Sequence, residues 1–188
     1  NGWTSFTTFS ANPVWFIALA FILPFWQDLH FYWVHRISHW KWLYDCSHYL
    51  HHRNTNVGPW SGLSMHPIEH LLYFTRWIIL FIVPSHPIHM FYLMQRPALN
   101  PALGHTGFDR IVLKEEGEGI SIDSYFHYLH HRFFECNYGT TTVPLDRWFG
   151  TLHDGTPESY GRMRGEQHMP ADVEASITKF NNSRPHTL

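Results

Sequence analysis

Histidines recur at helical spacing along this chain, and that spacing constrains its fold more than any other feature. An HxxxH motif occupies residues 35–39, and HxxHH motifs occupy residues 48–52 and 127–131. Residues three and four positions apart lie on one face of an α-helix, with Cβ atoms about 5–6 Å apart. Each motif therefore predicts a helix that aims imidazoles at one point. In each HxxHH we expect the first histidine to act with both later ones, while the adjacent pair diverges somewhat.

The motifs together predict a metal site. Imidazole is a ligand for iron, zinc, copper and nickel, and three such helices can surround a two-metal centre. One motif alone is often only polar surface, but three of them within 188 residues are hard to produce by chance. With only two cysteines, an iron–sulfur site has no support. The eight candidate ligands are His35, His39, His48, His51, His52, His127, His130 and His131.

Further polar residues near the motifs are weaker candidates. His66 and His70 flank a predicted helix start at Pro67 and are possible direct ligands. Glu69 between them is a carboxylate that could orient a ligand histidine through its second ring nitrogen. Two aspartates have the same potential role, Asp28, two helical turns before His35, and Asp109. The alternative for Asp28 is a polar residue at the membrane boundary.

A long apolar segment precedes the first motif. Residues 13–34 are largely apolar, and their number is close to the ~20 needed to cross a bilayer core. Gln27, Asp28 and His30 lie in the second half, and Pro24 predicts a kink. We interpret the segment as a membrane helix whose far end leaves lipid and enters a polar site. The alternative is a long buried helix of a soluble domain.

The middle of the chain predicts two half-length apolar helices. Residues 68–83 and 87–94 flank a pair of prolines, and each stretch is too short to span a membrane alone. A hairpin that dips into one leaflet and a span completed across the break both remain open. Residues 97–109 are interrupted by proline and glycine, and residues 110–120 predict an exposed loop. Residues 121–134 predict a short helix, followed by turns and irregular structure.

Composition and charge narrow the class of protein. A net charge of −2 gives no electrostatic support for nucleic-acid binding. Aromatic residues make up 18% of the chain, which suits a membrane interface. We expect an all-α fold of membrane helices with a histidine-rich, helical metal-binding domain. Residues 1–160 predict the catalytic domain, truncated at its N-terminus because the chain begins without a signal peptide or upstream helices, and residues 161–188 predict a polar surface tail.

These motifs resemble the fatty acid hydroxylase/sterol desaturase superfamily, and most closely its sterol C5-desaturase-like and bacterial sterol-desaturase-like branches. The resemblance covers about two-thirds of the chain, in the family's order. The GHTG stretch within it adds His105 as a ninth metal ligand. The matching stretches are DLHFYWVHRISH (28–39), HYLHH (48–52), HPIEH (66–70), GHTGFD (104–109) and HYLHHRFFECNYGTTTVPLDRWFGT (127–151).

The resemblance implies an integral membrane enzyme with its histidines on the cytosolic side, in the endoplasmic reticulum of a eukaryote or the inner membrane of a bacterium. It implies two iron ions, and O2-dependent hydroxylation or desaturation of a lipid such as a sterol or fatty acyl chain. No HPGG-type haem-binding segment is present in the sequence. We therefore expect electrons from a separate cytochrome b5-like or ferredoxin-like protein.

Three alternatives to this interpretation remain open. The first is a desaturase or an aldehyde-processing relative in place of a hydroxylase, which the motifs do not separate. The second is a membrane protein that holds structural or stored zinc without redox chemistry, because zinc accepts imidazole readily. The third, a metal-dependent hydrolase, is disfavoured because the chain has no HExxH motif.

Overall fold

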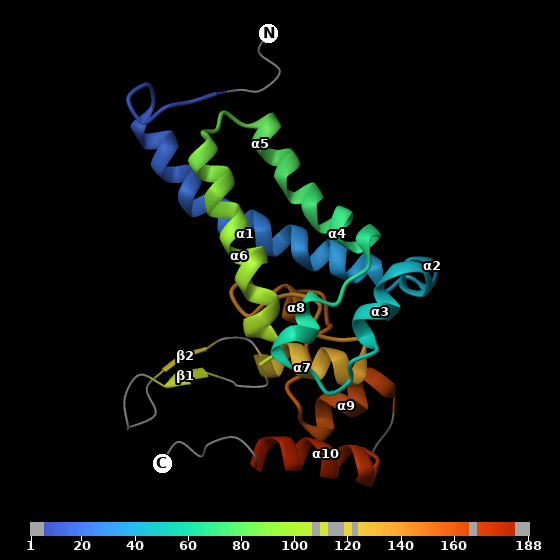
Figure 1. Ribbon diagram of the computed structural model, residues 1–188. Coiled ribbons are helices and arrows are strands. Elements are labelled where there is room, and N and C mark those ends of the chain that lie inside the picture. The colour runs from blue at the N-terminus through green and yellow to red at the C-terminus, as the bar shows by residue number, and fades with distance from the viewer. Residues whose placement is uncertain (1–5, 107–109, 113–118, 122–123, 166–168, 183–188) are drawn as a thin grey trace.

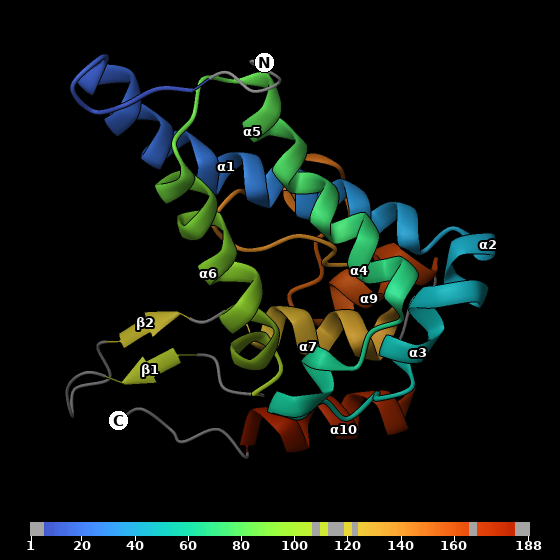
Figure 2. The same cartoon turned by 45° about the horizontal axis from the view of Figure 1, so that its top comes forward.

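The computed structural model describes residues 6–106, 110–112, 119–121, 124–165 and 169–182, and these residues are mostly helical. Helices α1, α4, α5 and α6 form one end of the molecule, and α7, α9 and α10 form the other (Figures 1 and 2). The mainly helical fold class is therefore confirmed.

Helix α1 spans Pro13–Ser38 and is the long apolar helix that the sequence predicts. Asn12 begins it, because its side chain accepts a hydrogen bond from the backbone N–H of Trp15, and Pro13 occupies the first turn. Pro24 lies inside the helix, whose axis changes direction along its length in Figure 1. Among the described residues, α1 is the one helix long and apolar enough to cross a membrane.

The chain turns after α1 and continues through short helical pieces. Helix α2 (Lys41–Leu43) leads into a π-helical turn, η1 (Tyr44–His48), and then into α3 (Tyr49–His52). Single π-helical turns widen a helix locally and are frequent at functional sites. The 3₁₀ helix η2 (Pro59–Leu63) follows.

A helical hairpin packs beside α1. Its first arm joins α4 (Pro67–Phe74), η3 (Thr75–Ile78) and α5 (Ile79–Ile82), and its second arm is α6 (Pro87–Gly104). Both arms begin in the same way, with a histidine ring that accepts a backbone N–H and a proline in the first turn. The hairpin interpretation therefore fits better than a span completed across the proline pair.

Helix α6 continues through Pro97 and Pro101, so the prediction of irregular structure from residue 97 was wrong for residues 97–104. Tertiary packing explains the difference, because the backbone of η2 lies directly against this part of α6. A Cβ atom added to Gly62 of η2 would come within 2.1 Å of the carbonyl oxygen of Pro101. Packing of this kind overrides the low helix propensity of proline.

Two short strands interrupt the helical fold. Strand β1 (Arg110–Val112) pairs antiparallel with β2 (Gly119–Ser121), so that Ile111 lies opposite Ile120. The exposed loop predicted for residues 110–120 therefore contains two paired strands in its described part. Strands of three residues leave only a weak pattern in sequence, because so few positions show little alternation.

The C-terminal half forms helices α7 (Ser124–Phe133), α8 (Leu145–Trp148), α9 (Pro157–Arg164) and α10 (Ala171–Asn182). Met169 and Ile177 are buried in a cluster with Tyr128, Leu129 and Phe133. The predicted polar surface tail therefore contains a helix with buried anchors at Met169 and Ile177, while most of its other described side chains are exposed. Val173 and Ile177, four positions apart, give α10 a narrow apolar face that was too sparse to stand out from the polar residues around it.

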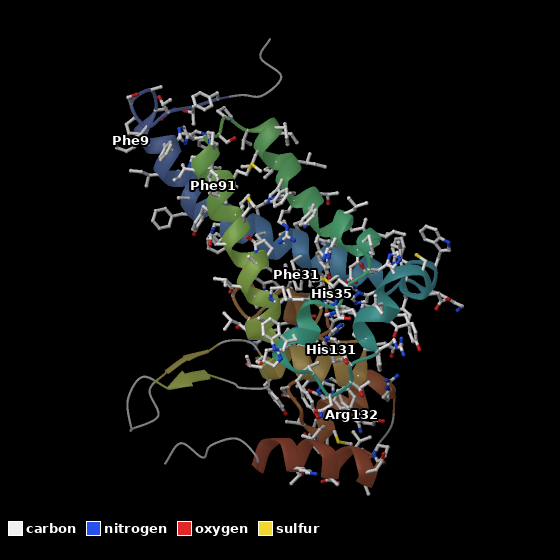
Figure 3. The ribbon with its side chains drawn as sticks, in the orientation of Figure 1. Phe9, Phe31, His35, Phe91, His131 and Arg132 are labelled. Atoms are coloured by element: carbon white, nitrogen blue, oxygen red, sulfur yellow. The ribbon has the colours of Figure 1, made fainter. Side chains whose placement is uncertain are left out.

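Separate apolar clusters hold the two ends of the molecule. Leu19 and Leu23 of α1 pack with Leu80 of α5 and Leu93 of α6. The cluster around α7 lies at the other end, as described above. Fully buried histidines lie in the core between them rather than on the surface. Figure 3 shows His35 and His131 in this central region, remote from Phe9 and Phe91.

Candidate metal centre

Nine histidines gather in two adjacent groups, and within each group all the candidate ligand nitrogens lie within 4.8 Å of one another. The five-histidine group contains His35, His39, His48, His52 and His130. The four-histidine group contains His51, His105, His127 and His131. These are the nine residues that the sequence motifs and the resemblance predicted as ligands. Their binding of metal remains a proposal.

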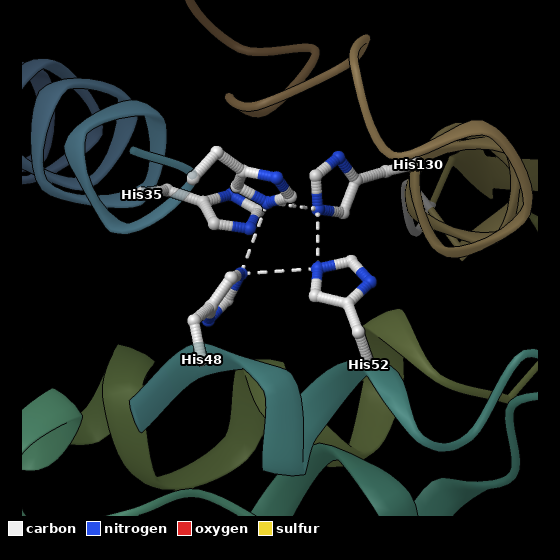
Figure 4. Close-up of side chains that lie close together, drawn as sticks. His35, His48, His52 and His130 are labelled. Carbon is white, nitrogen blue, oxygen red and sulfur yellow. Dashed lines mark hydrogen bonds between the residues drawn. The ribbon is translucent and has the colours of Figure 1, made fainter. Parts of the chain in front are cut away.

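Four Nε2 atoms of the five-histidine group form a closed ring. The Nε2 atom of His48 lies 3.0 Å from those of both His39 and His52. His130 closes the ring, at 3.2 Å and 3.1 Å from the same two atoms. Figure 4 shows His48 and His52 rising from one helical segment toward His130 on another. The Nε2 atom of His35 is buried beside this ring and has no hydrogen-bond partner.

The four-histidine group has a different arrangement. The Nε2 atoms of His105, His127 and His131 form a triangle with sides of 3.1 Å. The Nε2 atom of His51 lies 3.1 Å from that of His131. This group therefore combines the first HxxHH, the end of α6 and the second HxxHH.

Each HxxHH motif contributes to both groups, which corrects one expectation. His48 joins His52, four positions later, while His51 points to the other group. The second motif is divided in the same way, with His127 and His131 in one group and His130 in the other. The reason is the helix itself, because residues four apart nearly eclipse while adjacent residues diverge by about 100°. The HxxxH pair stays together, as predicted.

The outer ring nitrogens fix how these imidazoles point. The Nδ1–H groups of His35, His105 and His130 donate to the carbonyl oxygens of Tyr138, Pro101 and Cys136, at 2.7, 2.6 and 2.6 Å respectively. A neutral imidazole carries one N–H group. Because Nδ1 carries it in each of these bonds, Nε2 is unprotonated and its lone pair is free to bind a metal ion. Lone pairs that face one another at 3.0–3.2 Å repel unless a cation lies among them. The donor set therefore fits metal ions.

Glu69 contacts one of the candidate ligand histidines, the contact that its predicted orienting role requires. Its side chain is fully buried, and its Oε1 atom accepts a hydrogen bond of 2.7 Å from Nδ1–H of His48. A carboxylate in this position fixes the tautomer of the ligand histidine and raises its basicity.

The buried imidazoles are neutral at physiological pH. Burial, with the neighbouring imidazoles, lowers the pKa of His39 to about 2 and the pKa of His51 to about 3. Burial also lowers the pKa of His105 to about 4. The neutral form is the one that binds a metal ion, so no proton needs to be displaced near pH 7.

The number of nitrogens in each group bears on the kind of metal site. With a metal–nitrogen bond of about 2.1 Å, ligands at right angles lie about 3.0 Å apart and tetrahedral ligands about 3.4 Å apart. The observed separations of 3.0–3.2 Å are compatible with a shared metal ion in each group. Structural zinc sites are typically tetrahedral, with four ligands. The five-histidine group offers one imidazole more than such a site holds.

A loop after α7 places two of the carbonyl acceptors. Asn137 has a left-handed backbone, with φ 53°, and its side-chain amide donates to the carbonyl oxygens of Phe126 and His153. The Asp146 carboxylate accepts hydrogen bonds of 2.8 Å from the backbone N–H groups of both Tyr138 and Gly139. Sequence reasoning assigned none of these residues a role. The only signal was their place in the CNYG and DRWFGT stretches of the resemblance.

The remaining candidates lie outside both groups. His66 caps α4, and His70 lines a cavity beside the metal groups. Asp28 is buried and lines the same cavity, two turns along α1 from His35. Asp109 lies outside the described residues. Of the weaker candidates, Glu69 is the one placed in direct hydrogen-bond contact with a candidate ligand, His48.

The cavity has a volume of about 590 Å³ and adjoins mainly the four-histidine group. His51, His105 and His127 of that group line it, with His35 as the one member of the other group. Most of its wall is apolar and comes from α1, η2, the helical hairpin and the segment after Gly139; its apolar residues include Phe31, Leu63, Met65, Tyr73, Phe74, Trp77, Met94 and Leu103. The five-histidine group instead meets a smaller, open pocket of about 480 Å³ at His39.

Comparison with known proteins agrees with this architecture of helices around clustered histidines. The family model described as fatty acid hydroxylase matches residues 18–151, which is most of the chain. The chain belongs to the fatty acid hydroxylase family, within the fatty acid hydroxylase/sterol desaturase superfamily. No solved structure matches it at a significant level.

Curated relatives include three kinds of enzyme. A Delta(7)-sterol-C5(6)-desaturase of Nicotiana tabacum is 28% identical over 87% of this chain and 60% of the relative. A methylsterol monooxygenase of Arabidopsis thaliana is 30% identical over 74% of the chain and 58% of the relative. A very-long-chain aldehyde decarbonylase of Oryza sativa subsp. indica is 29% identical over 76% of the chain and 56% of the relative. The chain spans roughly half the length of the curated relatives it matches.

Proposed function

We propose that this chain is the catalytic part of a membrane-bound, non-haem di-iron oxygenase that hydroxylates or desaturates a C–H bond of a lipid. The observation that carries the proposal is the pair of adjacent histidine groups, with facing Nε2 lone pairs, beside an apolar cavity. The named activities of the relatives, on sterols and very-long-chain aldehydes, support a lipid-modifying oxidoreductase.

The nine histidines would hold two iron ions, one in each group. Bound iron supplies the activation of O2 that oxidation of an unactivated C–H bond requires. The protein holds the imidazoles neutral and fixes their direction through the carbonyls of Pro101, Cys136 and Tyr138 and through Glu69. It also encloses the reacting region in an apolar wall that excludes water.

Exposed apolar side chains support a membrane location. Phe21 and Phe25 of α1, Phe81 and Ile82 of α5, and Phe91 of α6 are each at least 60% exposed. Contiguous apolar surface of this kind on a helical hairpin and its neighbour marks a membrane contact. We propose that these helices lie in the bilayer and that the histidine groups lie at its cytosolic face, in the endoplasmic reticulum of a eukaryote or the inner membrane of a bacterium.

The electrons would come from a separate cytochrome b5-like or ferredoxin-like protein. Hydroxylation and desaturation would begin with the same hydrogen abstraction, so the histidine groups serve either outcome. The position of the lipid in the cavity would then decide between them.

The test combines metal analysis with oxygen consumption. Protein purified in detergent is reconstituted anaerobically with Fe(II), and O2 uptake is followed with reductant and lipid present. Two irons per chain and lipid-dependent O2 uptake are the expected results. Zinc that does not exchange with iron, together with no O2 uptake, would instead support the structural zinc alternative.

A pair of variants connects the result to the site. His51→Ala removes a member of the four-histidine group and should lose one metal and the activity. His70→Ala removes a histidine that lies outside both groups and should keep both metals. Full metal content and full activity in His51→Ala would contradict the assignment.

A further inference from the structure

Several buried polar atoms in the cavity wall have no hydrogen-bond partner within the protein. Gln27 of α1 is 5% exposed, and its Oε1 atom is buried without a hydrogen bond. The Oγ1 atom of Thr140 is also buried and without a partner. Both residues line the apolar cavity beside the metal groups. Buried polar atoms are nearly always satisfied in folded proteins, so these two indicate a ligand.

The chemistry of these atoms defines what that ligand carries. An amide oxygen only accepts hydrogen bonds, so its partner is a donor. The hydroxyl of Thr140 can accept or donate, and it complements an oxygen that does both. A hydroxyl group on an otherwise apolar ligand matches the hydrogen-bonding capacity of each residue.

The charges around the cavity favour a neutral head group. Asp28 and Arg76 both line it, and their formal charges are opposite. The cavity wall therefore has no net charge that would recognise a carboxylate, a phosphate or an amine. The rest of the wall is mainly apolar, and the volume of about 590 Å³ lies within the range typical of small-molecule sites.

We propose that Gln27 and Thr140 form a subsite for the hydroxyl group of a lipid alcohol. The inference rests on the proposed function, because it assigns the substrate class of the same cavity. Gln27 lies eight residues before His35 on α1, which corresponds to about 12 Å along the helix axis. The subsite therefore lies about 12 Å along α1 from the nearest of the nine histidines in sequence.

The experiment compares each alcohol with its own methyl ether, which keeps the oxygen but loses the donor. The probes are cholesterol, hexadecan-1-ol and their O-methyl ethers. Binding to the metal-loaded full chain in detergent is followed by the fluorescence of the tryptophans, one of which, Trp77, lines the cavity. We expect at least one of the alcohols to bind about tenfold more tightly than its ether, since one hydrogen bond is lost.

Variants assign the preference to the subsite. Gln27→Leu removes the acceptor at similar volume and should bring the alcohol and ether affinities to within about twofold. Thr140→Val should reduce the difference partly. Gln95→Leu makes the same substitution at an exposed glutamine of α6 and should leave the tenfold preference unchanged.

The possible outcomes separate the inference from the proposed function. Equal binding of alcohol and ether, tighter binding of hexadecanoic acid than of hexadecan-1-ol, or a preference that survives in Gln27→Leu each overturns the subsite. The comparison of alcohol with ether in the wild-type protein can overturn the proposal by itself. It does so even if Gln27→Leu fails to fold. Lack of iron-dependent O2 uptake in a protein that still prefers the alcohol overturns the oxygenase and leaves the subsite standing.

Discussion

The two histidine groups use the same side chain and differ in how many of them they contain and in what they face. The five-histidine group forms a ring of four nitrogens with His35 beside it, and it is tied to Glu69 and to the loop after α7. The four-histidine group has fewer ligands, and three of its rings line the apolar cavity. Fewer protein ligands leave more positions for exogenous ligands.

This difference between the groups indicates which metal would lie beside the substrate. A metal in the four-histidine group would have both the free positions and the contact with the cavity. A metal in the five-histidine group would have more protein ligands, and that group contacts the large cavity through His35 alone and the smaller pocket through His39. We therefore expect changes at the two groups to have unequal effects, and four predictions test that inequality.

Loss of one ligand should have the largest effect, and it should be larger in the four-histidine group. His131→Ala leaves three imidazoles there, whereas His52→Ala leaves four in the other group. We expect His131→Ala to lose one metal per chain and at least about 100-fold in activity, and His52→Ala to keep more of its metal. Metal analysis and O2 uptake measure both, with His70→Ala as the control. Equal metal loss in the two variants would remove the distinction between the groups.

Acid should destabilise the metal-free protein next most strongly. Because the folded-state pKa of each buried imidazole is below its ordinary value of about 6.5, the unfolded chain binds more protons. The contribution of these imidazoles to the free energy of unfolding is therefore fully present above pH 6.5 and decreases as the pH falls. For His105 the loss runs down to about pH 4, and for His39 to about pH 2.

Chemical denaturation of the metal-free protein across pH 7 to 3 measures this dependence. His105→Gln should reduce the dependence of the unfolding free energy on pH only above about pH 4. His39→Gln should reduce that dependence below pH 4 as well. An unfolding free energy that does not change between pH 6.5 and 4 would show that the imidazoles are not buried and neutral.

A steric change at Gly62 should affect the four-histidine group alone. An added Cβ would lie 2.1 Å from the Pro101 oxygen and 2.7 Å from Nδ1 of His105, so the α6 backbone or the His105 ring must move. We expect Gly62→Ala to cost about 1–3 kcal/mol of stability and to weaken metal binding in that group. Gly58→Ala is the control, because its Cβ would meet nothing within 4 Å. Metal loss from the five-histidine group in place of the four-histidine group would contradict this assignment.

The smallest effect is expected at Glu69. Glu69→Gln keeps the shape and an acceptor oxygen for His48 but removes the ionisable carboxyl group. We expect the metal affinity of the five-histidine group to fall about tenfold, the lower end for such orienting partners, and that of the four-histidine group to be unchanged. Competition with a chelator measures the two affinities, and Glu158→Gln on the exposed side of α9 is the matched control. Unchanged affinity in both groups would leave Glu69 with a packing role only.

The sequence alone predicted the long helix, the short helix of the second HxxHH and, from helical spacing, eight of the nine histidines that come together. These eight signals are local, because each motif occupies only five residues, whereas His105 came from the family resemblance. The sequence did not predict the helix over residues 97–104 or the buried contacts of α10, where packing against distant segments decided the structure. In both cases the local pattern was weak or unfavourable, and contacts made only in the folded chain supplied the stability.

The sequence by itself therefore determined that this protein carries a helical histidine site of a known family. Only the tertiary structure decided which histidines share a group. His51 and His52 are adjacent in sequence but belong to different groups, whereas His52 and His130 are far apart in sequence and have their Nε2 atoms 3.1 Å apart. The physical reason is that helical spacing fixes the direction of each ring, while the packing of α1, α3, α6 and α7 fixes where those directions meet.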